Sequence, residues 1–206
     1  MGRPLGIPDD PLFQTRVLRA AFATLEHGGP GPVFAEFDED IPVINPIEDQ
    51  QWACPVSFVK ETAEEGFEGS VSQEIELLTP WYEKGQQDKG YTSVGASGLS
   101  VAEINRFLNG FFEDESAQEN PSSDLPLGDT FKLAVEDLKA FYNEAAAAQP
   151  GYASSKDVAD WFWGETSAGR MLLQLKQACS EHPDGLVKLF ALFVLVPVAQ
   201  SYRLKG

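Results

Sequence analysis

The most apolar stretch of the chain lies near its C-terminus, over residues 186–199. It is shorter than the roughly 20 residues that a bilayer-spanning helix needs, and Lys188 interrupts it. Before Pro197, which would stop or kink a helix, the stretch is apolar on nearly all sides of a helix. Such a helix is usually surrounded by other elements, because no side of it favours water. The sequence therefore predicts a buried helix over residues 186–196, around which the other helices pack.

A first helix is predicted near the N-terminus, over about residues 11–27. Asp10 can accept hydrogen bonds from the free N–H groups of a first helical turn, and Pro11 fits the next position. Apolar residues then recur on one helical face as far as Leu25. The segment 27–30, which contains two glycines and a proline, should end the helix.

Two capping boxes mark the starts of later helices. Ser100 with Glu103, and Ser154 with Asp157, have the spacing at which the two side chains satisfy free N–H groups reciprocally. Asp157 is accordingly interpreted as a capping residue, with catalysis as the alternative. Between the two boxes, a clearly amphipathic helix is predicted to open near Asp129.

The segment after Ser154 should contain a helix, an interruption and a second helix. Gly164 is interpreted as the interruption, and Thr166 or Ser167 can cap the helix that follows. Gly169 is interpreted as the place where two helices cross closely.

The pattern is weaker over residues 56–98. It favours short helices over 58–65 and 73–78, although 71–78 could equally be a strand, and it favours a turn over 79–82. The glycine-rich segment 85–98 predicts a mobile surface loop, with a lid as the alternative. It lacks the Gly-Lys-Ser/Thr ending of a phosphate-binding loop.

Together these patterns predict a mainly α fold. The 206 residues are 43% apolar and 11% aromatic, which is enough for a sizeable core, and no linker is long or polar enough to divide them. We expect a single domain over residues 1–206, a bundle of about six to eight helices with a minor extended segment.

The charge of the chain limits its partners. A formal net charge of −17 repels phosphate backbones and anionic membranes, so neither nucleic acid nor a membrane is expected as a partner. The N-terminus lacks the apolar stretch of a signal peptide, which makes the cytoplasm the expected compartment. The oligomeric state is left open.

Few residues are available for metal or thiol chemistry. The chain contains two cysteines, Cys54 and Cys179, and two histidines, His27 and His182. This set excludes a disulfide scaffold and a Cys/His zinc cluster. No nucleotide-binding or catalytic-triad motif is present, so no cofactor is expected.

Acidic residues are concentrated in one segment. Seven carboxylates and no Lys or Arg lie between Glu26 and Asp49. If residues 33–43 are extended, Glu36, Asp38 and Asp40 share one face, which is either solvated or able to hold a hard divalent cation. The segment could alternatively bind a basic protein through electrostatic steering, as an inhibitor, immunity or regulatory protein would.

The best candidate for a site is the aromatic and acidic segment 156–170. On a helix, Asp160 and Trp163 are one turn apart, and a carboxyl held against indole loses hydration. Loss of hydration raises its pKa, which suits a general acid or base near neutrality. Asp160 and Glu165 are therefore the predicted catalytic residues.

Ligand-binding residues are predicted around this pair. The predicted set comprises Trp161, Trp163, Tyr142, Phe107 and Arg170, lining an aromatic pocket between helices. The simpler interpretation is that the aromatic residues belong to the core and that Glu165 pairs with Arg170. The first function hypothesis is a protein that binds a small organic molecule, with cofactor-independent acid/base catalysis as an extension.

Overall fold

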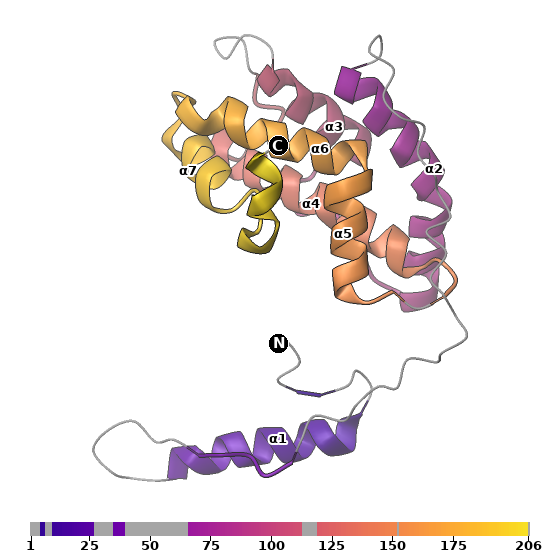
Figure 1. Ribbon diagram of the computed structural model, residues 1–206, viewed down its shortest axis with the longest axis vertical. Coiled ribbons are helices and arrows are strands. Elements are labelled where there is room, and N and C mark those ends of the chain that lie inside the picture. Colours follow the sequence, from indigo (N-terminus) through magenta and orange to yellow (C-terminus); the bar gives the residue numbers. More distant parts are fainter. Residues whose placement is uncertain are drawn as a thin grey trace. The chain divides into compact units, whose positions relative to one another are not determined.

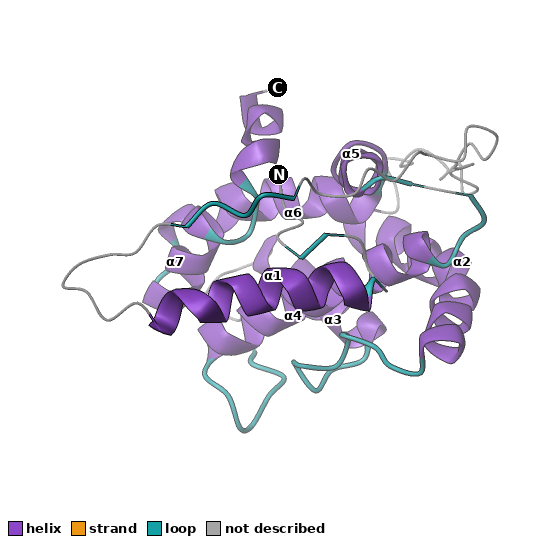
Figure 2. Cartoon of the chain, turned by 90° about the horizontal axis from the view of Figure 1, so that it is seen from below, coloured by secondary structure: helices purple, strands orange, loops and turns teal. Residues whose placement is uncertain are grey.

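The computed structural model describes residues 5–6, 10–26, 35–39, 66–112, 119–151 and 153–205. All regular secondary structure in these ranges is helical (Figure 2). The mainly α prediction is confirmed.

The chain divides into two compact units, residues 1–49 and residues 50–206. The single domain over residues 1–206 stays a prediction. The first unit contains α1 (Pro11–Ala23) and the short 3-10 helix η1 (Thr24–Glu26). The helices of the second unit are α2 (Gly66–Lys89), α3 (Val101–Asn109), η2 (Gly110–Phe112), α4 (Leu127–Ala147), α5 (Ser155–Glu165), α6 (Ser167–Ala178), η4 (Cys179–Glu181), α7 (Gly185–Phe193) and η5 (Val198–Lys205).

The first unit confirms the predicted N-terminal helix. The Asp10 carboxylate accepts a hydrogen bond from the Phe13 N–H at 3.0 Å, as expected of a cap. The buried Phe13 ring meets Phe37 edge to face at 5.9 Å, and Arg16 forms two hydrogen bonds of 2.7 Å with Glu39. The described part of the predicted extended segment, residues 35–39, is therefore a loop against α1 and not a strand.

The centre of the second unit is α4, not the C-terminal apolar helix. Figure 1 shows α4 in the middle of the unit, with α2 on one side and α7 on the other, and α3 and α5 also pack on it. By contrast, α7 buries only Val187 and Ala191. Apolar residues on every side show that a helix disfavours water, but they do not show what covers it. α4 takes the central place because it carries many buried apolar residues, both large and small. These residues are Phe131, Ala134, Val135, Leu138, Phe141, Tyr142, Ala145 and Ala146.

The predicted turn at 79–82 is wrong, because α2 continues through Pro80 as one helix of 24 residues. Proline removes one backbone hydrogen bond from a helix interior. Here the loss is offset by a buried face that includes Val71 and Leu78, and by the close approach of Gly85 to α4. A Cβ added at Gly85 would lie 3.0 Å from the Ala148 Cβ. The predicted helix over 58–65 lies outside the described residues.

The predicted mobile loop over 85–98 is also wrong in its first part, since residues 85–89 belong to α2. The rest is held on α4 by a buried carboxylate. Asp137 accepts hydrogen bonds from the N–H groups of Gly95, Ala96 and Ser97 at 2.8–3.1 Å and from the Ser97 hydroxyl at 2.6 Å. The segment is therefore a structural connection and not a lid.

The capping predictions are confirmed. Both capping boxes form, at Ser100 with Glu103 and at Ser154 with Asp157. Thr166 caps α6 by accepting a hydrogen bond from the Gly169 N–H at 2.9 Å. These helix caps were predictable because each involves residues only three positions apart.

Among the described helices, α7 has the most apolar composition. No single described helix is both long and apolar enough to cross a membrane. α7 and η5 reach the required composition only when taken together, and they are bent by 95° relative to one another.

Candidate functional site

The predicted aromatic pocket is a sealed part of the core. Tyr142 is 0% exposed, Trp161 2%, Trp163 5% and Phe107 6%. The Tyr142 ring packs on Trp161 at 6.2 Å, whereas Phe107 belongs to α3 and packs on Phe111 at 5.3 Å. Helical spacing places these rings inward, but it cannot distinguish the wall of a hollow from a filled interior. The ligand-binding role of these rings therefore finds no support in their geometry.

A cation of the chain already lies over the ring of Trp163. The Lys139 ammonium lies 5.9 Å from the centre of a Trp163 ring, and it lies 3.9 Å from the Glu136 carboxylate. Burial lowers the pKa of Lys139 despite the nearby Glu136. The aromatic face of Trp163 thus has a cation from the chain itself near it.

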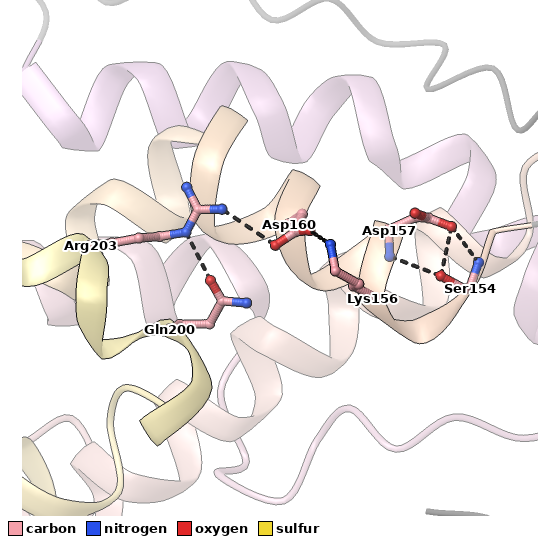
Figure 3. Close-up of polar contacts among 6 residues, drawn as sticks. All are labelled: Ser154, Lys156, Asp157, Asp160, Gln200 and Arg203. Carbon is pink, nitrogen blue, oxygen red and sulfur yellow. Dashed lines mark hydrogen bonds and ion pairs between the residues drawn. The ribbon is translucent and has the colours of Figure 1, made fainter. Parts of the chain in front are cut away.

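Asp160 is an ion-paired carboxylate. Its two oxygens meet Lys156 Nζ at 2.5 Å and Arg203 Nη2 at 3.4 Å, so that it lies between them (Figure 3). The hydrogen bond from Lys156 is the main reason that the pKa of Asp160 is lowered. The sequence predicted a raised pKa, and this prediction is wrong because the hydrogen bond from Lys156 outweighs the desolvation that raises the pKa.

Glu165 lies at the end of α5 with its side chain exposed. Its backbone carbonyl, and not its carboxylate, accepts a hydrogen bond from Arg170 Nη1 at 3.1 Å. Arg170 Nη2 also donates to the Ser167 hydroxyl at 3.0 Å. Catalysis by Asp160 and Glu165 stays a prediction, but the two carboxyl groups do not share a hollow with the buried indoles.

The structure instead forms an open groove between α6 and η5, with a volume of about 280 Å³. It contains Arg170, which the sequence predicted, and Arg203, which it did not. The described residues that line it are Arg170, Leu173, Gln174, Gln177, Arg203 and Leu204. Among the described residues, the groove therefore offers two guanidinium groups, two carboxamides and two apolar side chains, and no carboxylate.

The Arg203 side chain is positioned by three neighbours. Its Nε donates to Gln200 Oε1 at 2.8 Å, and its Nη2 reaches Asp160 (Figure 3). A Cβ added at Gly164 would lie 2.8 Å from Arg203 Nη1. Gly164 is thus not the predicted interruption, since α5 runs through it, and its missing side chain lets the guanidinium lie against α5. The prediction that two helices cross closely at Gly169 is confirmed, because a Cβ there would collide with the Phe162 carbonyl.

Sequence reasoning missed a deeply buried carboxylate, Glu74. Its oxygens accept hydrogen bonds from the Ser167 N–H at 2.5 Å, the Ala168 N–H at 3.2 Å and the Tyr142 hydroxyl at 2.8 Å. It therefore links α2 to the first turn of α6. Burial raises the pKa of Glu74, and the three hydrogen bonds oppose that shift. The available signal was an acidic residue at the same helical face as Val71 and Leu78.

Metal binding is not indicated by the described residues. Within the ranges that the structure describes, no group of three or more His, Cys, Asp or Glu side chains could hold a metal ion. Glu36 and Asp38 are exposed, whereas Asp40 lies outside the described residues, so a cation at these three carboxylates stays a prediction. Most of the acidic segment from Glu26 to Asp49 is likewise outside them, and its basic protein partner stays a prediction.

Comparisons with protein-family models, with curated proteins and with solved structures gave no match. What the protein does must therefore be inferred from its own residues. Among the described hollows, the groove between α6 and η5 is the one lined by two arginines. The hollow in the first unit, of about 170 Å³, is mostly apolar and includes Glu36 and Phe37.

Proposed function

We propose that the protein binds a small organic anion in the groove between α6 and η5. The observation that supports this proposal is the convergence of two guanidinium groups, Arg170 and Arg203, on one groove of a chain of net charge −17. Guanidinium groups match the planar geometry of carboxylate and phosphate and can bind either with two hydrogen bonds.

The rest of the groove fits an organic body attached to the anionic group. Gln174 and Gln177 offer both donors and acceptors, and Leu173 and Leu204 offer apolar contact. The volume of about 280 Å³ is at the small end of ligand sites in proteins, which favours a compact molecule. A short-chain carboxylate or a small phosphate ester has suitable dimensions and chemistry.

An incoming anion would compete with Asp160 for Arg203. The distance between Asp160 Oδ1 and Arg203 Nη2 is 3.4 Å, which is long for a charged hydrogen bond. Asp160 keeps its shorter contact with Lys156 when Arg203 turns towards a ligand. The exchange therefore leaves no carboxylate without a cation.

Binding, and not acid/base turnover, is the activity that this geometry favours. The lowered pKa of Asp160 keeps its carboxyl ionised at neutral pH, so it has no proton to give, and its two oxygens already contact Lys156 and Arg203. Glu165 is not among the described residues that line the groove, and neither is any other carboxyl group.

Butyrate, succinate and inorganic phosphate are suitable probes of the groove, with butylammonium as the opposite-charge control. We expect at least one anion to shift the amide NMR signals of α6 and η5. Arg170→Gln and Arg203→Gln should each weaken its binding by about tenfold, as the loss of a charged hydrogen bond implies.

Arg106→Gln is the matched control, because Arg106 is exposed on α3 and does not line the groove. Its binding should equal that of the wild type. Equal binding by all three variants, or a preference for butylammonium, would contradict the proposed anion site.

A further inference from the structure

The end of α7 and the start of η5 expose a group of large apolar side chains, which we call the apolar corner. Phe193 is 74% exposed and Val198 is 89% exposed. The remaining members are Leu189, Leu192 and Val194, all of them exposed. Soluble proteins rarely expose several neighbouring large apolar residues unless the surface meets a partner or a membrane.

The corner projects because of the way α7 ends. Leu189, Leu192 and Phe193 have the spacing of one helical face, whereas Val187 and Ala191 are buried on the other. Pro197 then separates α7 from η5, and the two segments meet at 95°. Figure 1 shows α7 at the edge of the second unit. The exposed face therefore belongs to a bend at the periphery and not to a groove in the bundle.

The charge of this segment is opposite to that of the chain. Residues 185–206 contain Lys188, Arg203 and Lys205 and no Asp or Glu, although the chain as a whole has a net charge of −17. Lys188 pairs with Glu181, and Arg203 with Asp160. The segment itself is thus apolar and basic, although two of its three cations are paired with carboxylates outside it. Apolar and basic side chains occur together in helices that bind the surface of an anionic bilayer.

Two lysines from other helices add positive charge beside the corner. The Lys176 ammonium donates hydrogen bonds to the backbone carbonyls of Ala191, at 3.2 Å, and Leu192, at the end of α7. The Lys132 ammonium lies 5.5 Å from the centre of the Phe190 ring. Lys132 of α4 and Lys176 of α6 thus lie beside α7, and Glu136 lines the same hollow as Lys132, Phe190 and Val194.

We propose that the apolar corner docks the protein onto an anionic lipid bilayer. Phe193 and Val198 enter the boundary between headgroups and acyl chains, and Lys132, Lys176 and Lys188 face the lipid phosphates. α7 has nine residues and a length of about 14 Å, so it lies in the interface and does not span the bilayer. The net charge of the whole chain opposes binding, but at physiological salt only charges within about 8 Å act strongly on the membrane.

Vesicle flotation of the full chain tests this docking surface. The vesicles contain phosphatidylcholine alone or phosphatidylcholine with phosphatidylserine. We expect binding to the mixed vesicles and little to phosphatidylcholine alone. Phe193→Ser with Val198→Ser should lower the bound fraction at least tenfold, because each serine removes the transfer of an apolar side chain out of water.

Leu77→Ser is the matched control, since Leu77 is 51% exposed on α2, on the other side of α4. It should bind like the wild type, and circular dichroism should show the same helix content for all variants. Failure of the wild type to bind either vesicle, or equal binding by the double variant, overturns the proposal.

Sedimentation velocity separates the bilayer from a second copy as the occupant. The proposal expects a species whose mass does not depend on Phe193 and Val198 in the absence of vesicles. A dimer that the double substitution abolishes, together with no vesicle binding, would overturn the bilayer in favour of self-association.

Discussion

Glu74 shows how one buried residue ties two helices together. It is a carboxylate of α2, and its hydrogen bonds to Ser167 and Ala168 satisfy N–H groups at the start of α6. The Tyr142 hydroxyl adds a link to α4. Burial and the neighbouring Glu74 raise the pKa of Tyr142, so the tyrosine keeps the proton that it donates. Three of the helices in the second unit therefore depend on a single carboxyl group.

The raised pKa of Glu74 makes a definite prediction about pH. The ordinary value for the group is 4.5, and the folded protein has a higher one. The folded state thus holds this proton more tightly than the unfolded state does, so its contribution to stability is complete below pH 4.5. That contribution is lost as the pH rises through the folded-state pKa. Above this pKa, Glu74 no longer makes the free energy of unfolding depend on pH.

Glu74→Gln should remove this pH-dependent contribution, because glutamine does not ionise. Urea unfolding at a series of pH values above 4.5 measures the free energy of unfolding of each protein. Glu76→Gln, at an exposed position of the same helix, should keep the wild-type slope. Glu74→Ala should lower stability by about 3 kcal/mol, since it leaves three buried donors without their acceptor. Identical slopes for wild type and Glu74→Gln would contradict the assignment.

At the scale of elements, α2 tolerates a proline that it does not need. Pro80 is exposed, so its ring makes no core contact that another side chain must replace. The Thr79 hydroxyl donates to the Ile75 carbonyl at 2.7 Å and satisfies one acceptor near the proline. The cost of the proline is therefore mainly the lost backbone hydrogen bond and the clash with the preceding turn.

Pro80→Ala should stabilise the protein by about 2 kcal/mol. The gain in helix propensity of about 3 kcal/mol exceeds the added conformational entropy of the unfolded chain, which is about 1 kcal/mol. Thermal unfolding measures the difference. Pro183→Ala, in the exposed turn between η4 and α7, is the control and should not stabilise. A destabilised Pro80→Ala protein would show that the bend or the ring has a packing role.

What the sequence predicted at this scale depended on local signals. The boxes at Ser100 and Ser154 and the cap at Thr166 were predictable because each acts within four residues. The path of α2 through Pro80 was not, since it depends on packing against α4, far along the chain.

The candidate site was predicted in part for the same reason. Arg170 was found within the aromatic and acidic segment, but its groove partner Arg203 comes from η5 and shares no local pattern with it. The burial of Trp161 and Trp163 could not be predicted either. Helical spacing shows which face of a helix a side chain is on, but not whether it reaches solvent.

At the scale of the whole molecule, the net charge of −17 should destabilise the fold by self-repulsion. Sodium chloride screens this repulsion, so the Tm should rise between low and physiological salt. Replacing the exposed Glu76 and Glu83 of α2 by lysine reverses two charges and should reduce the salt dependence. The control Ser72→Ala, at an exposed position of the same helix, leaves the net charge unchanged and should retain it. A Tm that is independent of salt in the wild type would contradict the prediction.

One short element takes part in both proposed sites. η5 spans eight residues, and it contributes Arg203 to the groove and Val198 to the apolar corner. An anion that turns Arg203 away from Asp160 would thus act on the segment that meets lipid. Thermodynamic reciprocity requires that whatever the ligand does to membrane affinity, the membrane does equally to ligand affinity. If both proposed sites bind their ligands, the two binding events would be coupled through η5. The fraction of the protein on a membrane would then depend on the concentration of the anion.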